Sequence, residues 1–172
     1  MSITLIPYQH DFLDVLCEWR KEPVMLKYNP VDDLTPAQVH ERRLGERSDF
    51  ADFDKAEAFF WFIQSEEKVV GNISVREINR RMLTAELGYG IAPEARGNGY
   101  ATAAVRLVTQ RAFSDSPLRK LIAYVHERNV ASRRVLEKTG YTAEGVLREH
   151  YLINGVPVNE IIYGILRREV IL

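Results

Sequence analysis

A glycine-flanked helix start constrains the fold of this chain more than any other feature of its sequence. The stretch PEARGNGYATAAV, residues 93–105, follows the strand-like run Thr84–Ile91. The first helical turn has no acidic residue and no strong side-chain cap, although free N–H groups and the macrodipole make that end positive. Gly97 and Gly99 leave no side chain over the backbone amides, and Arg96 adds a positive charge. The pattern favours a bound phosphate group, with a simple strand–helix turn as the alternative.

The predicted helix packs against a core, but its glycine loop does not match two common nucleotide-binding motifs. Its apolar stripe consists of Ala101, Ala104, Val105, Val108 and Ala112. The chain contains no Gly-Lys-Ser or Gly-Lys-Thr for a P-loop, and Thr102 stands where a dinucleotide-binding G-x-G-x-x-G would place its third glycine. A different phosphorylated ligand is therefore expected.

The remaining sequence predicts alternating strands and helices. Strand-like runs are Ser2–Pro7, Ala58–Ser65, Val69–Glu77, Thr84–Ile91, Lys120–Val125 and two final runs joined by Asn154-Gly155, a type I′ hairpin signal. Helix starts are expected at Asp11 as an N-cap, at Thr35 in a capping box with Gln38, and at Asn129, with Gly140 ending the last helix. The pattern indicates the α+β class, with a largely antiparallel sheet and helices packed on it.

Composition and charge exclude several classes of protein. The 172 residues suit one domain, expected here to span residues 1–172. The 23 basic and 24 acidic residues are mixed and give a net charge of −1, which argues against a nucleic-acid partner. A single cysteine, Cys17, excludes an internal disulfide and a multi-cysteine metal site, so no metal is expected. With no evident signal peptide or membrane span, we expect a cytoplasmic monomer or homodimer without a membrane partner.

Two signatures resemble those of one enzyme family. The loop Arg96–Ala101 resembles the R/Q-x-x-G-x-G/A loop of the GNAT superfamily of acyl-CoA-dependent N-acyltransferases. Asn129–Ser132 and Glu137–Tyr141 are similar to its second signature, N-x-x-S followed by E-K-x-G-[FY]. Glu144-Gly145 resembles a pair found in the RimJ/RimL-type branch, which acetylates protein N-termini. The resemblance implies the GNAT fold: a mixed, mostly antiparallel seven-stranded sheet with helices on both faces and a central splayed strand pair.

The same resemblance implies acetyl-CoA, released as coenzyme A, as the co-substrate. Backbone amides of the glycine loop would hold its pyrophosphate, Glu86–Ile91 would pair with the pantetheine amides, and Asn129 would hydrogen-bond the pantetheine arm. The residues expected to bind it are Tyr89, Gly90, Ile91, Arg96, Gly97, Asn98, Gly99, Tyr100, Ala101, Thr102, Asn129 and Ser132.

The implied reaction is direct transfer of the acetyl group to an amine, without a covalent enzyme intermediate. Ser132 would be a donor to the leaving thiolate, and a backbone N–H at Tyr89 or Ile91 would stabilise the oxyanion. Glu86 is the expected proton acceptor because it lies on the strand beside the acyl slot, with Glu149–Tyr151 as alternates. The serine also suits an ordinary first helical turn and Glu86 a solvated strand edge, so structural roles are the alternative interpretation.

The sequence departs from the family pattern at two positions. Leu136 stands where related enzymes often carry a tyrosine that acts as general acid, so that role would fall to Ser132, to Tyr141 or to water. Asn159 stands where many RimJ/RimL-like members have aspartate. The segment Lys21–Glu57 is expected to shape the acceptor pocket.

The sequence leaves the acceptor open. The first choice is the α-amine of a protein or peptide N-terminus, and the second is a small-molecule amine such as a polyamine, an amino acid or an antibiotic. A CoA-binding module without turnover is a further alternative, which the missing tyrosine supports. An oxidoreductase is a remote one.

Overall fold

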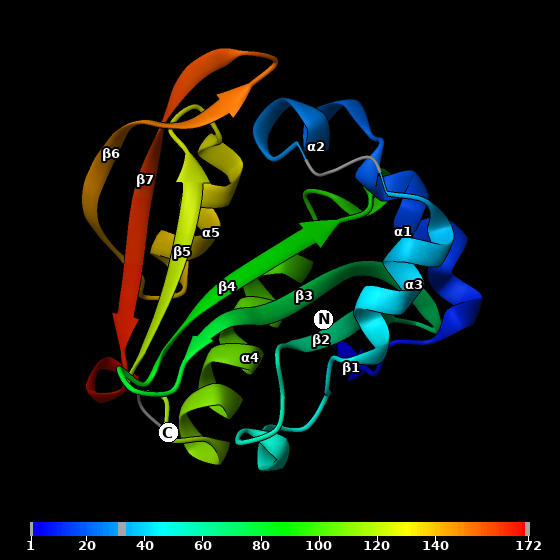
Figure 1. Ribbon diagram of the computed structural model, residues 1–172, viewed down its shortest axis with the longest axis horizontal. Coiled ribbons are helices and arrows are strands. Elements are labelled where there is room, and N and C mark those ends of the chain that lie inside the picture. The colour runs from blue at the N-terminus through cyan, green and yellow to red at the C-terminus, as the bar shows by residue number, and fades with distance from the viewer. Residues whose placement is uncertain (1, 31–33, 171–172) are drawn as a thin grey trace.

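A seven-stranded sheet runs through the computed structural model, which describes residues 2–30 and 34–170 (Figure 1). The strands are β1 (Thr4–Ile6), β2 (Phe59–Ser65), β3 (Lys68–Asn79), β4 (Thr84–Ile91), β5 (Lys120–His126), β6 (Thr142–Ile153) and β7 (Val156–Leu166). Their order in the sheet is β1-β2-β3-β4-β5-β7-β6, and every neighbouring pair is antiparallel except β4 and β5. The predicted mixed, mostly antiparallel α+β fold is confirmed.

Helices lie on both faces of this sheet. They are α1 (Leu13–Arg20), α2 (Pro23–Tyr28), α3 (Pro36–Leu44), α4 (Tyr100–Asp115) and α5 (Val130–Lys138), with short 3-10 turns at His10–Phe12, Phe50–Asp52, Pro93–Ala95 and Arg167–Glu169. Helices α4 and α5 lie behind the sheet in Figure 1, whereas α1 and α3 lie over the β1–β3 half, and α2 lies beyond the end of β4.

Strand β2 supplies side chains to a hydrophobic cluster on each face. Five consecutive residues, 59–63, are buried, because alternate side chains of a strand point to opposite faces. Phe60 and Phe62 belong to a cluster with Leu16 of α1 and Val39 of α3. Their neighbours Phe59, Trp61 and Ile63 belong to the main core, which includes the apolar stripe of α4. Residues 59–63 of β2 therefore contribute side chains to both hydrophobic clusters.

The central strands β4 and β5 part after a short stretch of parallel pairing. Only three residue pairs join them, the last being Glu86 with Ile122. Beyond that point the two strands diverge, as Figure 1 shows, and each is held by its other neighbour, β4 by β3 and β5 by β7. The splayed strand pair that the resemblance implied is confirmed, and residues 87–91 of β4 run along the edge of the opening.

Local signals for the helix starts and the last hairpin are largely confirmed. Helix α4 begins after Gly99, whose φ is 79°, with no side-chain cap and no acid in its first turn. The Thr35–Gln38 capping box of α3 forms as predicted. Gly140 follows α5 with a φ of 92°, and Asn154-Gly155 turns β6 into β7 with φ values of 51° and 76°. The last pair fits a type I′ turn.

One predicted helix start was wrong. Asp11 lies inside the 3-10 turn, and α1 begins at Leu13 with Phe12 as its N-cap and no side-chain hydrogen bond there. The N–H of Phe12 donates to the carbonyl of Gln9 at 3.2 Å. The tighter turn thus precedes the α-helix, and Asp11 no longer stands at the N-cap position from which a side chain can accept from the first helical N–H groups.

Strands β3 and β4 approach closely at Gly71 of β3, because glycine has no side chain there. An added Cβ would overlap the carbonyl oxygen of Gly90 and lie 3.2 Å from the Cα of Ile91, both on β4. Gly71→Ala should therefore lower the free energy of unfolding by about 1–3 kcal/mol in urea titrations, the usual range for overpacking. The control is Gly45→Ala, whose Cβ would meet its nearest neighbour, a Glu57 oxygen, at 3.5 Å. Equal stabilities for the two variants would contradict this packing.

Candidate active site

The loop before α4 is open and shaped by its own backbone. Gly97 and Gly99 have φ values of 81° and 79°, in the left-handed region that favours glycine. A Cβ on Gly97 would meet no atom within 4 Å. The Asn98 amide donates to the carbonyls of Ala95 and Arg96 at 3.2 Å each, which fixes the loop. An uncapped helix start with open space before it fits a phosphate group.

Arg96 connects this loop to helix α2. Its Nη2 lies 2.7 Å from Oε2 of Glu22, and its Nε donates to the carbonyl of Ile91 at 3.3 Å. Glu22 also caps α2 by accepting from the N–H of Met25 at 3.0 Å. The hydrogen bond with Arg96 is the largest influence on Glu22 and lowers the pKa of that carboxyl to about 2. A phosphate bound by Arg96 would therefore compete with a carboxylate that is ionised at neutral pH.

The two faces of β4 carry different groups, because successive side chains alternate. Glu86 and Gly90 share one face, and a Cβ on Gly90 would lie 3.1 Å from Cε of Met25, so this face points toward α2. Tyr89 lies on the other face, where it packs against the main core and reaches α5.

Tyr89 and Ser132 meet across the opening on the α5 side. The Tyr89 hydroxyl lies 2.8 Å from Oγ of Ser132 and 3.2 Å from the Ser132 carbonyl oxygen. Burial raises the pKa of Tyr89 to about 12, an effect that its hydrogen bond with Ser132 only partly opposes. Oδ1 of Asn129 accepts from the N–H of Ser132 at 3.1 Å, so the predicted N-cap of α5 also holds the serine in place.

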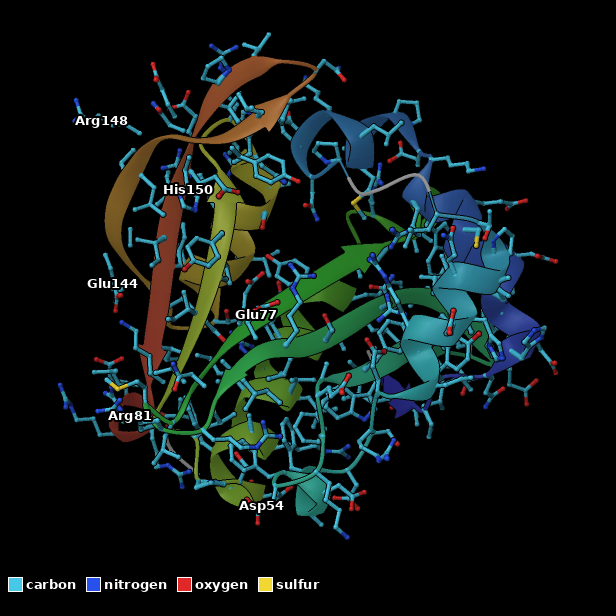
Figure 2. All side chains as sticks on the ribbon, in the orientation of Figure 1. Asp54, Glu77, Arg81, Glu144, Arg148 and His150 are labelled. Atoms are coloured by element: carbon cyan, nitrogen blue, oxygen red, sulfur yellow. The ribbon has the colours of Figure 1, made fainter. Side chains whose placement is uncertain are left out.

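Carboxylates gather on the opposite face, toward α2. Oε1 of Glu86 accepts from Nη2 and Nε of Arg76 at 2.5 and 3.1 Å. Burial raises the pKa of the Glu160 carboxyl, and the charge of Glu86 raises it further. His150 opposes this rise; its Nε2 lies 3.9 Å from Oε2 of Glu160. Figure 2 shows His150 over the strands β5 and β7, where its ring stacks on Tyr124 at a centroid distance of 5.9 Å.

The alternate acceptors on β6 have structural partners. The pairing of β6 with β7 is irregular between Leu147 and Tyr151, and Glu149 within this bulge has a φ of 51°. The Tyr151 hydroxyl donates to the carbonyl of Pro30 at 2.9 Å, which ties the hairpin to the segment after α2. His126 at the end of β5 is buried, and its Nδ1 accepts from the N–H of Arg128 at 3.0 Å.

Asn159 has a role that an aspartate could not fill. Its Oδ1 accepts from the N–H of Glu149 at 2.9 Å, while its Nδ2 donates to the carboxylate of Glu127 at 3.0 Å. An ionised aspartate accepts hydrogen bonds only. The departure from the RimJ/RimL-like pattern thus has a local structural cause.

The position of the missing tyrosine lies inside the core. Leu136 is fully buried. Tyr141, the predicted alternative, is also buried and exchanges a 2.9 Å hydrogen bond with Thr109; burial raises the pKa of its phenol. Neither position places a hydroxyl at the opening, whereas Oγ of Ser132 lies at its rim, 2.8 Å from the Tyr89 hydroxyl.

Cys17 is a partly buried residue of helix α1. Cys17 packs against the α1–α3 cluster, and burial is the main cause that raises the pKa of its thiol, which disfavours a nucleophilic thiolate. Across residues 2–30 and 34–170, no three His, Cys, Asp or Glu side chains come together as a metal site. Over the same described ranges, no helix is long and apolar enough to cross a membrane.

Several residues around the opening were not predicted from the sequence. They are Glu22 and Met25 of α2, Arg76, Glu160 and the side-chain hydroxyl of Tyr89. Helix α2 has only six residues, although Pro23 at its first position is a helix-start signal that could have located it. The partners of Arg76, Glu160 and Tyr89 lie 10 or more residues away in sequence, so spacing gives no signal for them.

Comparison with known proteins decides the family. Residues 2–142 match the acetyltransferase (GNAT) domain. The chain belongs to this family. It is 36% identical over 126 residues to the probable N-acetyltransferase YjcK of Bacillus subtilis, an alignment that covers 73% of this chain and 70% of the relative. The activity class is therefore N-acetyl transfer with acetyl-CoA as the acyl donor.

Two solved structures share the fold. RimJ of Mycobacterium smegmatis, solved with a CoA-disulfide, superposes with a TM-score of 0.86 at 20% identity, covering 99% of this chain and 84% of RimJ. Spermidine N-acetyltransferase of Vibrio cholerae, solved with CoA and spermine, superposes with a TM-score of 0.83 at 20% identity, covering 97% and 96%. At this identity the likeness concerns the fold, and this GNAT protein's acceptor has to be argued from its own residues.

The open loop yields a direct test of CoA binding. CoA at 100 times its Kd should stabilise the wild type by about 2.7 kcal/mol, seen as a raised melting temperature. Gly97→Asp should abolish this rise by placing a negative charge beside the pyrophosphate. Gly155→Asp is the matched control, because Gly155 has a φ of 76° and equally open surroundings at the hairpin turn. A full CoA-induced shift in Gly97→Asp would contradict the placement of the phosphate site.

Proposed function

We propose that this GNAT protein acetylates the α-amine of a protein or peptide N-terminus directly, within a ternary complex with acetyl-CoA. The observation that carries the proposal is that different polar groups lie on the two faces of the sheet at β4. The hydroxyl groups of Tyr89 and Ser132 lie on the α5 side, and the carboxylates of Glu86 and Glu160 lie on the α2 side. The opening between β4 and β5 joins the two sides.

Binding of acetyl-CoA uses the start of α4 and the free edge of β4. The amides of residues 97–101 and the side chain of Arg96 hold the pyrophosphate, and the edge at residues 87–91 pairs with the pantetheine amides. Asn129, already the cap of α5, contacts the pantetheine arm. Acetyl-CoA supplies the acetyl group as a thioester, and coenzyme A leaves as the thiolate.

Residues on either side of the opening then serve the transfer. A backbone N–H of Tyr89 or Ile91 stabilises the negative charge that develops on the thioester oxygen. Ser132 donates to the leaving sulfur from the α5 side. Glu86 lies on the α2 side and accepts the proton that the neutral amine loses on attack: Arg76 occupies Oε1, which leaves Oε2 for the amine or a bridging water.

The strength of base that the reaction needs favours an α-amine. With a pKa near 8, about a tenth of an α-amine is neutral at pH 7, whereas a lysine-like amine near 10.4 is below about a thousandth. Glu86 forms an ion pair with Arg76, with 2.5 Å between Nη2 and Oε1. A carboxylate that accepts a proton, directly or through water, suffices for an amine that is already partly neutral.

A small polycationic amine is the second candidate acceptor. The carboxylates of Glu86 and Glu160 on the open side would bind more than one ammonium group of such an amine. This candidate is supported by the fold shared with a spermidine N-acetyltransferase, as the first candidate is by the fold shared with RimJ.

An acceptor panel separates these functions. N-terminal peptides that lack lysine, N-terminally blocked peptides that contain lysine, and spermidine are incubated with acetyl-CoA, and the released thiol is measured. We expect peptides with a free N-terminus to give the highest kcat/KM. A higher value for spermidine would establish the polyamine function instead, and the absence of thiol release with every amine would leave only a CoA-binding module.

The pH dependence tests Glu86. The value of kcat/KM should fall as pH falls through the pKa of the proton acceptor. If Glu86 is that group, Glu86→Gln should alter this acidic limb of the pH profile. The change should be larger when the acetylated amine is lysine-like than when it is an α-amine. Glu144→Gln is the matched control, because Glu144 forms a strand ion pair of the same length, 2.5 Å to Lys120. Figure 2 shows it at the outer side of β6. An unchanged limb in Glu86→Gln would assign the proton acceptor to another group.

A further inference from the structure

Ser132, the expected donor to the leaving thiolate, has a hydrogen-bond partner of its own in the structure. Leu136 cannot donate a proton, and the hydroxyl of Tyr141 is taken by Thr109. The hydroxyl of Tyr89 instead lies 2.8 Å from Oγ of Ser132. We propose that Tyr89 is a positioning residue for acetyl transfer: its hydroxyl donates to Oγ of Ser132 and so directs the serine proton toward the departing thiolate. This inference rests on the proposed function.

The pair is held by two separate elements that flank the opening. Tyr89 belongs to β4, three residues beyond the last pairing with β5. Ser132 stands in the first turn of α5, where Asn129 holds its backbone N–H. Because the strand and the helix fix the two hydroxyls independently, their distance does not depend on a flexible loop.

Two arrangements of the two hydroxyl protons are compatible with these distances. In one, Tyr89 donates to the carbonyl oxygen of Ser132, 3.2 Å away, and Ser132 donates to Tyr89. In the other, Tyr89 donates to Oγ of Ser132, and the serine proton is free to point away from the tyrosine. Hydrogen bonds to an anion are stronger than those between neutral groups, so a thiolate beside Ser132 favours the second arrangement. The change needs only rotation of two O–H bonds.

No covalent bond to the tyrosine or the serine changes in this scheme. The neutral amine nitrogen forms the new bond to the acetyl carbon and loses a proton to Glu86. The carbon–sulfur bond breaks, and its electron pair stays on sulfur. Burial holds the pKa of Tyr89 at about 12, so the phenol keeps its proton at neutral pH and acts as a hydrogen-bond donor rather than as an acid. The thiolate takes up a proton from water after transfer.

Removing single hydroxyls tests the inference. Tyr89→Phe should lower kcat by about 10-fold with CoA affinity unchanged, because the hydrogen bond matters most when sulfur becomes anionic. The double variant Tyr89→Phe/Ser132→Ala should be no slower than Ser132→Ala alone, since both changes break one chain of hydrogen bonds. Tyr141→Phe is the matched control: it removes a buried phenol hydroxyl whose 2.9 Å partner is Thr109 rather than Ser132, and should change kcat by less than about 2-fold.

A second readout is independent of turnover. In the complex with free CoA, the hydrogen-bond donor at Ser132 should favour the thiolate form of CoA. Tyr89→Phe and Ser132→Ala should therefore each raise the pKa of the bound thiol, which lowers its acid dissociation constant by about 10-fold. The ultraviolet absorbance of the thiolate measures this in a pH titration, with Tyr141→Phe again unchanged.

The two readouts separate the inference from the function on which it rests. A wild type that acetylates spermidine faster than any N-terminal peptide, and in which Tyr89→Phe lowers kcat and raises the thiol pKa, would support the inference and overturn the proposed acceptor. A wild type that acetylates amines while Tyr89→Phe changes neither kcat nor the thiol pKa would overturn the inference alone. Additive losses in the double variant, or an equal loss in Tyr141→Phe, would also overturn it.

Discussion

The structure depends on the parting of β4 and β5 after three residue pairs. A sheet edge with unpaired N–H and C=O groups is a site where an extended chain can add. Here such an edge opens in the middle of a sheet, and each half keeps its own support, because β4 pairs with β3 and β5 pairs with β7. The same opening lies next to the uncapped start of α4, so an extended ligand that ends in phosphate meets both of its recognition elements at one place.

Polar contacts between distant segments frame this opening on both sides. Arg96 joins the glycine loop to Glu22 at the start of α2, and Tyr151 joins the β6–β7 hairpin to the chain after α2. On the opposite face, Tyr89 and Ser132 join β4 to α5. Because Arg96 is shared between a carboxylate of α2 and the phosphate that the loop is expected to bind, occupation of the cofactor site and the position of the acceptor-side helix are physically connected.

Sequence reasoning succeeded where the signal is local. Gly99 before α4, Asn129 and Gly140 at the ends of α5, and the Asn154-Gly155 turn each follow from the backbone conformation that their position needs. It failed for Asp11, where a 3-10 turn replaces the expected cap. It could not find the bond between Tyr89 and Ser132, because these residues lie 43 positions apart and only the tertiary fold brings them together. The catalytic roles of Ser132 and Glu86 and the contacts to acetyl-CoA stay predictions.

Amide hydrogen exchange gives the most direct test of the central claim, that the opening between β4 and β5 binds acetyl-CoA with its pyrophosphate at the start of α4. Exchange is followed by NMR for the backbone N–H groups of residues 87–91 and 97–102, with CoA and with pantetheine, which lacks the pyrophosphate. We expect CoA to slow exchange in both segments and pantetheine to slow it in residues 87–91 alone. Slowing of both segments by pantetheine, or of neither by CoA, would contradict this placement of the ligand.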